Sequence, residues 1–189
     1  MTTINETIKE LQDAATAASL HYDVWWTLRS KVSRPHHVRV MNRYLHFFRS
    51  SISAHFVAML VALYRVYETR TDTHNITVLI NQIETQKLLP THILNALKEK
   101  CEIAKPLWIK VAILRNEVFG HRSIEKDSDS AFVKANLKPD DLLDLVSITK
   151  EILNELTGHL RDSMHAFNLS AVRDTARLLE DLSKNDVVD

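Results

Sequence analysis

The scarcity of turn-forming residues constrains the fold of this chain more than any other feature. Only two glycines and four prolines are spread over 189 residues. A sheet-rich protein of this length needs many more such residues at its turns, whereas long helices need few. Residues that favour helices, such as Leu, Ala, Lys, Glu and Arg, are abundant. The sequence therefore predicts an all-α fold, with one domain spanning residues 1–189.

The hydrophobic periodicity predicts a helical bundle. It has two long N-terminal helices, a short helix, a kinked helix and further helices near the C-terminus. Their expected ranges are 3–32, 36–68, 76–86, 90–120, 139–165 and 170–182.

Local signals mark several helix ends. Thr3 and Glu6 have the spacing of a capping box, which satisfies free amides at a helix start. Pro106 lies inside a helical pattern and removes one backbone donor, so we expect a kink or a short break near Ala104. The polar stretch 122–138 is expected to be a flexible loop, serving as a lid, a substrate guide or a plain linker. The tail 183–189 is expected to be frayed.

The charge balance gives no sign of a polyanion partner. Lys plus Arg equals Asp plus Glu at 24 each, so contact with a nucleic acid requires a local basic patch. One clearly basic helix face is present, formed by Arg39, Arg43 and His46 at spacings of four and three. This face is either a track for an RNA backbone or a solvated surface paired with acids elsewhere.

Cysteine usage and hydropathy indicate a cytoplasmic protein. Cys101 is the only cysteine, which excludes an intramolecular disulfide and suits a reducing compartment. We interpret it as a small core residue rather than a nucleophile. The N-terminus lacks the basic and apolar regions of a signal peptide. The longest apolar run, 56–64, is far shorter than the ~20 residues of a membrane helix, so no membrane association is expected.

The octapeptide 114–121 gathers the residues that suggest chemistry. Arg115 can grip a phosphate through parallel hydrogen bonds, His121 can exchange a proton near neutral pH, and the amide of Asn116 can orient either group. Gly120 favours a helix end, which lets the imidazole of His121 swing back toward Arg115. These are the groups needed to cleave a phosphodiester without a metal. Zinc-binding histidine spacings and a glycine-rich phosphate loop do not occur in the sequence, so no metal or cofactor is expected.

The segment 115–123 resembles the Arg-(Asn/Asp/His)-x4-to-x5-His signature of the HEPN superfamily (higher eukaryotes and prokaryotes nucleotide-binding). The most similar branch is named after bacterial abortive-infection U proteins, and there the motif commonly reads Arg-(Asn/Asp)-Lys-x-x-Ala-His followed by a charged residue and Asp. This chain departs from that pattern at Glu117, Gly120 and Ser123. The stretch 60–68 resembles the second helix of proteins in this branch. That helix is apolar and ends with an acidic residue, which in this chain is Glu68.

The resemblance implies an up-and-down helical bundle. It also implies a metal-independent endoribonuclease that acts as a toxin or phage-defence effector. Two protomers would pair so that both motif helices line one cleft. His121 would act as general base on a ribose 2′-hydroxyl or protonate the leaving oxygen, while Arg115 stabilises the charge at phosphorus and Asn116 positions His121 or the phosphate. Arg39, Arg43, His46 and Arg122 are candidate RNA contacts. The products would carry 2′,3′-cyclic phosphates.

Two other interpretations stay open. In one, the same dimer binds RNA, a nucleotide or a partner protein without catalysis. In the other, Arg115 and His121 are structural, with the guanidinium paired to Glu68 or Glu117. The sequence also leaves open whether the RNA is tRNA or mRNA, and whether an antitoxin or a nucleotidyltransferase is a further partner.

Overall fold

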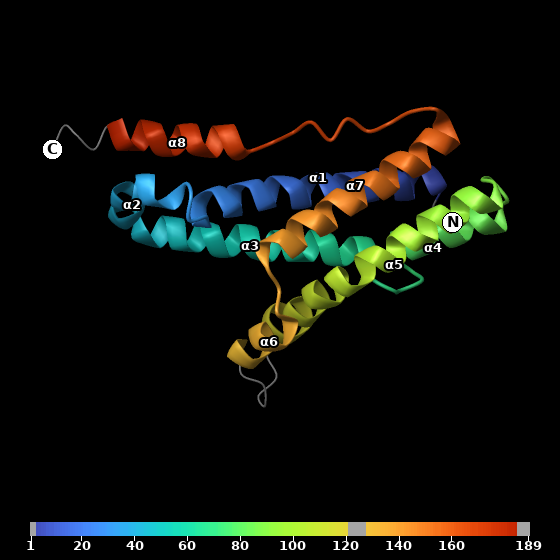
Figure 1. Cartoon of the computed structure of the whole chain (residues 1–189), viewed down its shortest axis with the longest axis horizontal. Helices are drawn as coiled ribbons and strands as arrows, with labels where there is room; N and C mark the ends of the chain where they lie inside the picture. Colours follow the sequence, from blue (N-terminus) through green and yellow to red (C-terminus); the bar gives the residue numbers. More distant parts are fainter. Residues whose placement is uncertain (1–2, 121–127, 185–189) are drawn as a thin grey trace.

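The fold is all-α, as the sequence predicts. A computed structural model describes residues 3–120 and 128–184. Within these ranges the chain forms eight α-helices and one π-helical segment, and no strand (Figure 1).

The first three helices form an elongated layer. α1 (Ile4–Arg29) and α3 (Leu45–Tyr67) lie side by side, and the short α2 (Arg34–Arg43) joins them at one end (Figure 1). The capping box is confirmed, because Glu6 N donates to Thr3 Oγ1 at 3.2 Å and Thr3 N donates to Glu6 Oε2 at 2.8 Å.

Two boundaries in this layer differ from the prediction. α1 ends at Arg29 rather than near Val32, because Ser30 adopts an extended conformation and its hydroxyl accepts from Ser33 N at 3.2 Å. The expected helix 36–68 is divided into α2 and α3. Tyr44 separates them, with φ −108° and ψ 44° outside the helical region.

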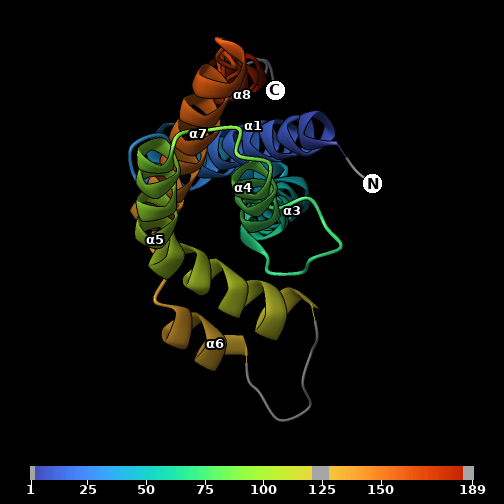
Figure 2. The same cartoon turned by 90° about the vertical axis from the view of Figure 1, so that its right-hand side faces the viewer.

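The next helices lead to the motif. α4 (Ile76–Thr85) begins at the cap Asn75, and α5 (Thr91–Leu114) runs without a break through Pro106. Figure 2 shows that α5 bends along its length, as an interior proline predicts. At its end the chain continues as η1 (Arg115–Gly120), a π-helical turn.

The prediction of a loop over 122–138 is wrong for its second half, where α6 (Ser128–Ala135) forms. Ala131 and Ala135 are buried on its inner face, so apolar burial stabilises a helix within a polar sequence. α7 (Pro139–Arg161) starts with proline in its first turn, and its C-cap is Asp162, which has φ 50°. An extended segment then leads to α8 (Val172–Lys184), which lies along α1 and α2 (Figure 1).

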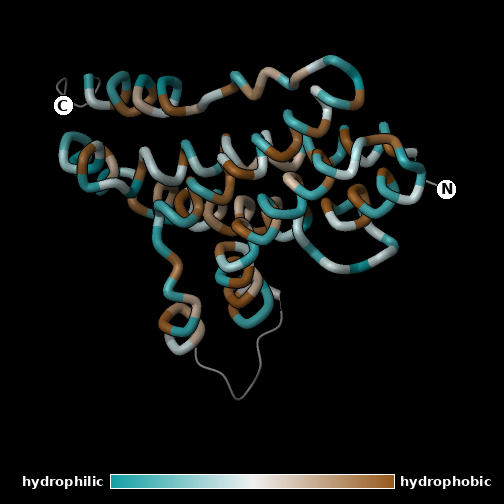
Figure 3. The backbone as a smooth tube through the Cα atoms, turned by 45° about the vertical axis from the view of Figure 1, so that its right-hand side comes forward, coloured by the Kyte–Doolittle hydropathy of each residue, from teal (hydrophilic) through white to brown (hydrophobic). Residues whose placement is uncertain are grey.

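Two hydrophobic clusters hold the helices together. Hydrophobic and hydrophilic residues alternate along the turns of the helices (Figure 3). In the larger cluster, fully buried side chains from α1, α3, α5 and α7 meet, among them Ile8, Leu63, Leu114 and Ile152. Leu179 of α8 packs in the second cluster, which comprises Leu28, Val40, Met41, Phe48 and Leu179.

Candidate functional site

The candidate site begins where α5 changes from α-helix to π-helix. Leu114, the last α-helical residue, is fully buried in the larger cluster and fixes the end of the helix. Arg115 and Asn116 are the first residues of η1. A π-turn closes i to i+5 hydrogen bonds, and such single turns within α-helices are frequent at functional sites. The structure therefore places both residues at the junction of α5 and η1, where the backbone of Arg115 keeps helical dihedrals, with φ −58° and ψ −43°.

Two neighbours hold the guanidinium of Arg115. Its Nη1 donates to Asn116 Oδ1 at 2.9 Å. Its Cζ lies 4.5 Å from the centre of the Tyr64 ring, a cation–π contact with α3. Arg115 is half-buried and Asn116 is exposed. Because guanidinium has five donors, this arrangement leaves N–H groups for an anionic ligand.

Tyr64 is the site residue that the sequence did not reveal. In the sequence it is one of many apolar positions on a core helix, and no local pattern links it to Arg115. In the structure its half-buried ring also packs near Trp108 of α5, with ring centres 6.3 Å apart. The buried Nε1 of Trp108 has no hydrogen-bond partner among the described residues.

Glu117 forms an ion pair with α6. Lys134 Nζ lies 2.6 Å from Glu117 Oε1, and the side chain of Glu117 is 17% exposed. Within the described ranges, neither Glu117 nor Glu68 forms an ion pair with Arg115. These contacts do not support the structural interpretation that pairs Arg115 with an acid.

His121 and Arg122, the other two motif positions expected to contact RNA, lie outside the described residues. Their roles stay predictions.

The predicted basic face is divided between two helices. Arg39 and Arg43 are exposed on α2, whereas His46 is exposed on α3 beyond the break at Tyr44. The Arg43 guanidinium lies 5.9 Å from the centre of the Tyr44 ring. α2 packs against α1, α3 and α8, whereas η1 packs against α3, α5 and α6. The basic face and Arg115 therefore occupy different parts of the fold.

A histidine pair links α1 and α3 away from the motif. His21 Nδ1 and His55 Nδ1 are 2.9 Å apart, so one ring donates to the other. Burial lowers the pKa of His21, and the nearby His55 lowers it further; burial also lowers the pKa of His55. Because the two rings are so close, the states in which at most one of them is protonated are favoured.

Cys101 is half-buried on α5, and burial raises the pKa of its thiol to about 11. A thiol with such a pKa is protonated at neutral pH and is a poor nucleophile. Across residues 3–120 and 128–184, no group of three or more His, Cys, Asp or Glu side chains is arranged to hold a metal ion.

α3 is the one helix in the described part of the chain that is long and apolar enough to cross a membrane. Its most apolar window of 18 residues has a mean hydropathy of 1.4. Core helices of soluble proteins also reach this value. Leu60, Leu63 and Val66 of α3 are fully buried, whereas 28% of the residues in the window are buried.

A comparison with known protein families identifies a match. The model of the HEPN_AbiU2 family, described as AbiU2, matches residues 1–185. No curated protein and no solved structure matches the chain.

Proposed function

Because this chain belongs to the HEPN-type AbiU2 family of abortive infection proteins, we propose that it is a metal-independent endoribonuclease. In this proposal a homodimer cuts RNA in the cytoplasm as a toxin or phage-defence effector. The observation that carries the proposal is the state of Arg115. Its guanidinium is held in place by an aromatic ring and an amide, and no carboxylate of the described residues neutralises it.

The proposed reaction is an attack of a ribose 2′-oxygen on the adjacent phosphorus. A P–O bond forms to the 2′-oxygen, and the bond to the 5′-oxygen of the next nucleotide breaks, leaving a 2′,3′-cyclic phosphate. His121 takes the 2′-hydroxyl proton or donates a proton to the leaving oxygen. Arg115 stabilises the negative charge that grows on the phosphoryl oxygens, and Asn116 keeps the guanidinium oriented.

The cation–π contact supports this role for Arg115. The face of the Tyr64 ring orients the guanidinium without cancelling its charge, whereas a carboxylate partner would compete directly with a phosphate. Catalysis by preorganised charge requires a group that is positioned before the substrate arrives.

Cleavage of total RNA and of tRNA by the purified protein in EDTA tests the proposal. We expect the wild type to cut and to leave 2′,3′-cyclic ends, and Arg115→Ala and His121→Ala to lose about 100-fold or more in rate. Matched controls are Arg177→Ala, whose side chain is 80% exposed on α8, and His92→Ala, which is exposed on α5. Both controls are expected to cut at the wild-type rate.

Equal cutting by all variants would indicate a contaminating nuclease and overturn the proposal. RNA binding without cleavage by any variant would instead favour the non-catalytic interpretation, in which the same dimer binds RNA, a nucleotide or a partner protein. The nuclease proposal also includes a further partner, either an antitoxin or a nucleotidyltransferase. It includes RNA contacts by Arg39, Arg43, His46 and Arg122.

A further inference from the structure

Two histidines on neighbouring helices meet between α1 and α3. His21 lies on α1 and His55 on α3, and their Nδ1 atoms are 2.9 Å apart. The ring centres are 5.0 Å apart, and the ring planes are inclined at 54° to each other. Because the two helices pack side by side, the backbone holds both rings close together before any ligand binds (Figure 1).

Core residues fix the helix turns that carry the pair. Ala18 and Tyr22, which flank His21 on α1, are buried. Met59, one turn after His55 on α3, is fully buried. The positions of the two histidine backbones therefore depend on the core and not on the hydrogen bond between the rings.

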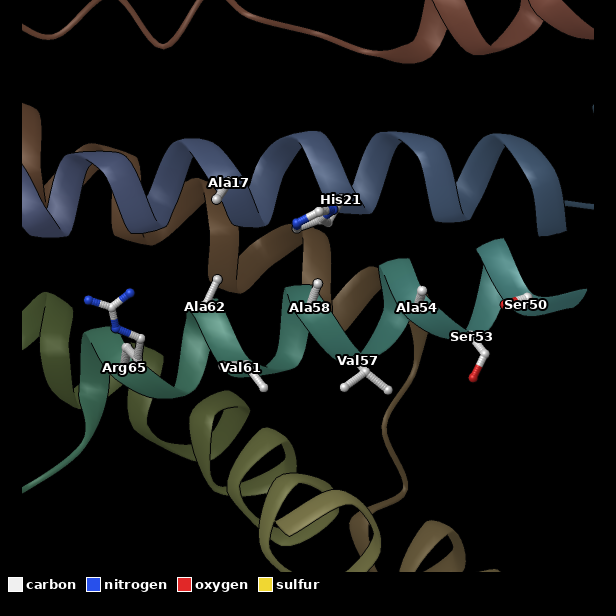
Figure 4. A pocket seen from close by; sticks show the side chains of 10 residues that line it. All are labelled: Ala17, His21, Ser50, Ser53, Ala54, Val57, Ala58, Val61, Ala62 and Arg65. Carbon is white, nitrogen blue, oxygen red and sulfur yellow. The ribbon is translucent and has the colours of Figure 1, made fainter. Parts of the chain in front are cut away.

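One side of the pair is open to solvent. Figure 4 shows His21 on the side of α1 that faces α3, at a groove of about 690 Å³. Ala17, Ala54 and Ala58 also line this groove, and their small side chains leave room beside the ring. Both histidines are half-buried. A small ion and water molecules can therefore reach His21 from the groove, and the second nitrogen lies 2.9 Å from its Nδ1.

The spacing of the two nitrogen atoms suits a metal ion. Zinc binds an imidazole nitrogen at about 2.0–2.1 Å, so two such nitrogens at an angle of about 90–110° lie roughly 2.8–3.4 Å apart. The observed Nδ1 separation of 2.9 Å falls within that range. Rotation of the side chains can aim both lone pairs at one ion while the helices stay in place.

The neutral pair can exchange its hydrogen bond for a metal without losing a proton. One Nδ1–H donates to the other Nδ1. When the donor ring carries its proton on Nε2 instead, both Nδ1 atoms offer a lone pair. Burial lowers the pKa of both imidazoles, so protons compete weakly with a cation at neutral pH.

We propose that His21 and His55 bind one divalent transition-metal ion, with water or a small anion at the remaining coordination positions. Imidazole suits Zn²⁺, Ni²⁺ and Cu²⁺, whereas Mg²⁺ and Ca²⁺ prefer oxygen ligands. Among the described residues, neither ring forms an ion pair with a carboxylate, so the site offers nitrogen ligands to the ion. Structural zinc sites have four protein ligands, whereas this site has two and is open.

The bound ion clips α1 to α3 and takes no part in RNA cleavage. His55 lies about 14 Å along α3 from Tyr64, so the ion does not contact the ring that holds Arg115. The inference therefore goes beyond the proposed function and does not depend on it. No sequence motif indicates the site, because the two histidines are 34 residues apart and lie on different helices.

Zinc titration of the full chain is the first test. The protein is purified without a polyhistidine tag, freed of metal with EDTA and transferred to chelator-free buffer at about pH 7.5. Isothermal titration calorimetry is expected to show saturable binding of one Zn²⁺ per chain, competition by Ni²⁺ and no binding of Mg²⁺. A wild type without saturable Zn²⁺ binding overturns the inference.

Variants of the two histidines identify the ligands. Loss of an outer-shell partner already weakens metal sites about 10–100-fold, so His21→Asn and His55→Asn are each expected to raise the Zn²⁺ dissociation constant about tenfold or more. His92→Asn, which replaces an exposed histidine on α5, is the control and is expected to bind as the wild type does. Circular dichroism spectra check that each variant keeps its helices. Undiminished binding by either folded variant overturns the inference.

A clip between helices also raises the thermal stability. Zn²⁺ at 100 times its dissociation constant is expected to raise the Tm of the wild type by about 5–11 °C, because the ion binds the folded state. At the same Zn²⁺ concentration, His21→Asn and His55→Asn are expected to gain at most about half as much. An equal rise in these variants, or no rise in the wild type, contradicts the proposed clip.

Nitrogen NMR identifies the ligand atoms in the wild type, so this test requires no variant to fold. Zn²⁺ is expected to shift the Nδ1 resonances of His21 and His55 and to leave those of the exposed His92 and His159 in place. Shifts confined to other histidines would place the ion elsewhere and overturn the inference. Because RNA cleavage is assayed in EDTA, failure of zinc binding leaves the nuclease proposal intact, and failure of cleavage leaves the metal site intact.

Discussion

At the residue scale, the ring of Tyr64 positions the guanidinium of Arg115 through a cation–π contact. The ring lies on α3 and the guanidinium on η1, so their contact depends on how α3 and α5 pack and cannot be recognised from sequence. Arg115 and Asn116 were recognisable, because their identity and short spacing lie within one continuous segment. The position of His121 relative to Arg115 was inferred from Gly120 and stays a prediction, since residue 121 is outside the described ranges.

Replacement of Tyr64 tests its role as a positioning residue. Tyr64→Leu removes the cation–π contact, which is worth about 0.5–2 kcal/mol, so we expect RNA cleavage to fall roughly two- to thirtyfold. Tyr64→Phe keeps the ring face and is expected to retain most of the rate. Single-turnover cleavage assays check both variants. If Phe impairs cleavage as much as Leu, the hydroxyl rather than the ring face is the important group.

At the element scale, the sequence predicted helices well and their breaks less well. Apolar spacing located α1, α4, α7 and α8. The apolar residues at helical spacing on α7 are buried, namely Leu142, Leu145, Val146, Ile152, Leu153 and Leu156. The division at Tyr44 was missed because neither glycine nor proline marks it. α6 was missed because its helix depends on the burial of two alanines. The residues around them are polar, so the sequence does not indicate this burial.

The start of α4 depends on one buried amide. Asn75 is fully buried, its Oδ1 accepts from Val78 N at 2.9 Å, and its Nδ2 donates to the carbonyl of Arg70 at 2.6 Å. Asn75→Ala loses the helix cap and leaves buried polar groups unpaired, so we expect the free energy of unfolding to fall by about 1–3 kcal/mol. Urea denaturation measures the loss. Thr85→Ala, an exposed change near the other end of α4, is the control and is expected to cost less than about 0.5 kcal/mol.

At the scale of the whole molecule, the histidine pair makes stability depend on pH. Burial lowers the pKa of both His21 and His55 in the folded protein, whereas the unfolded chain takes up these protons near the usual value of 6.5. The unfolded state therefore binds more protons as the pH falls below about 6.5. The contribution of the pair to stability is complete above that pH and is lost progressively below it.

Urea denaturation at about pH 7.5 and about pH 5.5 checks this dependence. We expect the wild type to lose stability at the lower pH, and the double variant His21→Asn/His55→Asn to lose clearly less. His92→Asn, which replaces an exposed histidine, is expected to behave as the wild type does. An unchanged loss in the double variant would assign the dependence to other groups.

The π-helical turn at 115–120 has a consequence for how this chain tolerates changes in length. A π-turn holds one residue more per hydrogen-bonded ring than an α-turn, so η1 can be regarded as an α-helical turn with one residue inserted. Deletion of Val118 would let the segment relax into regular α-helix. The helix would gain regular hydrogen bonds, yet every residue that follows would be rotated about the helix axis relative to Arg115. The site is thus sensitive to the number of residues in this turn, independently of their chemistry.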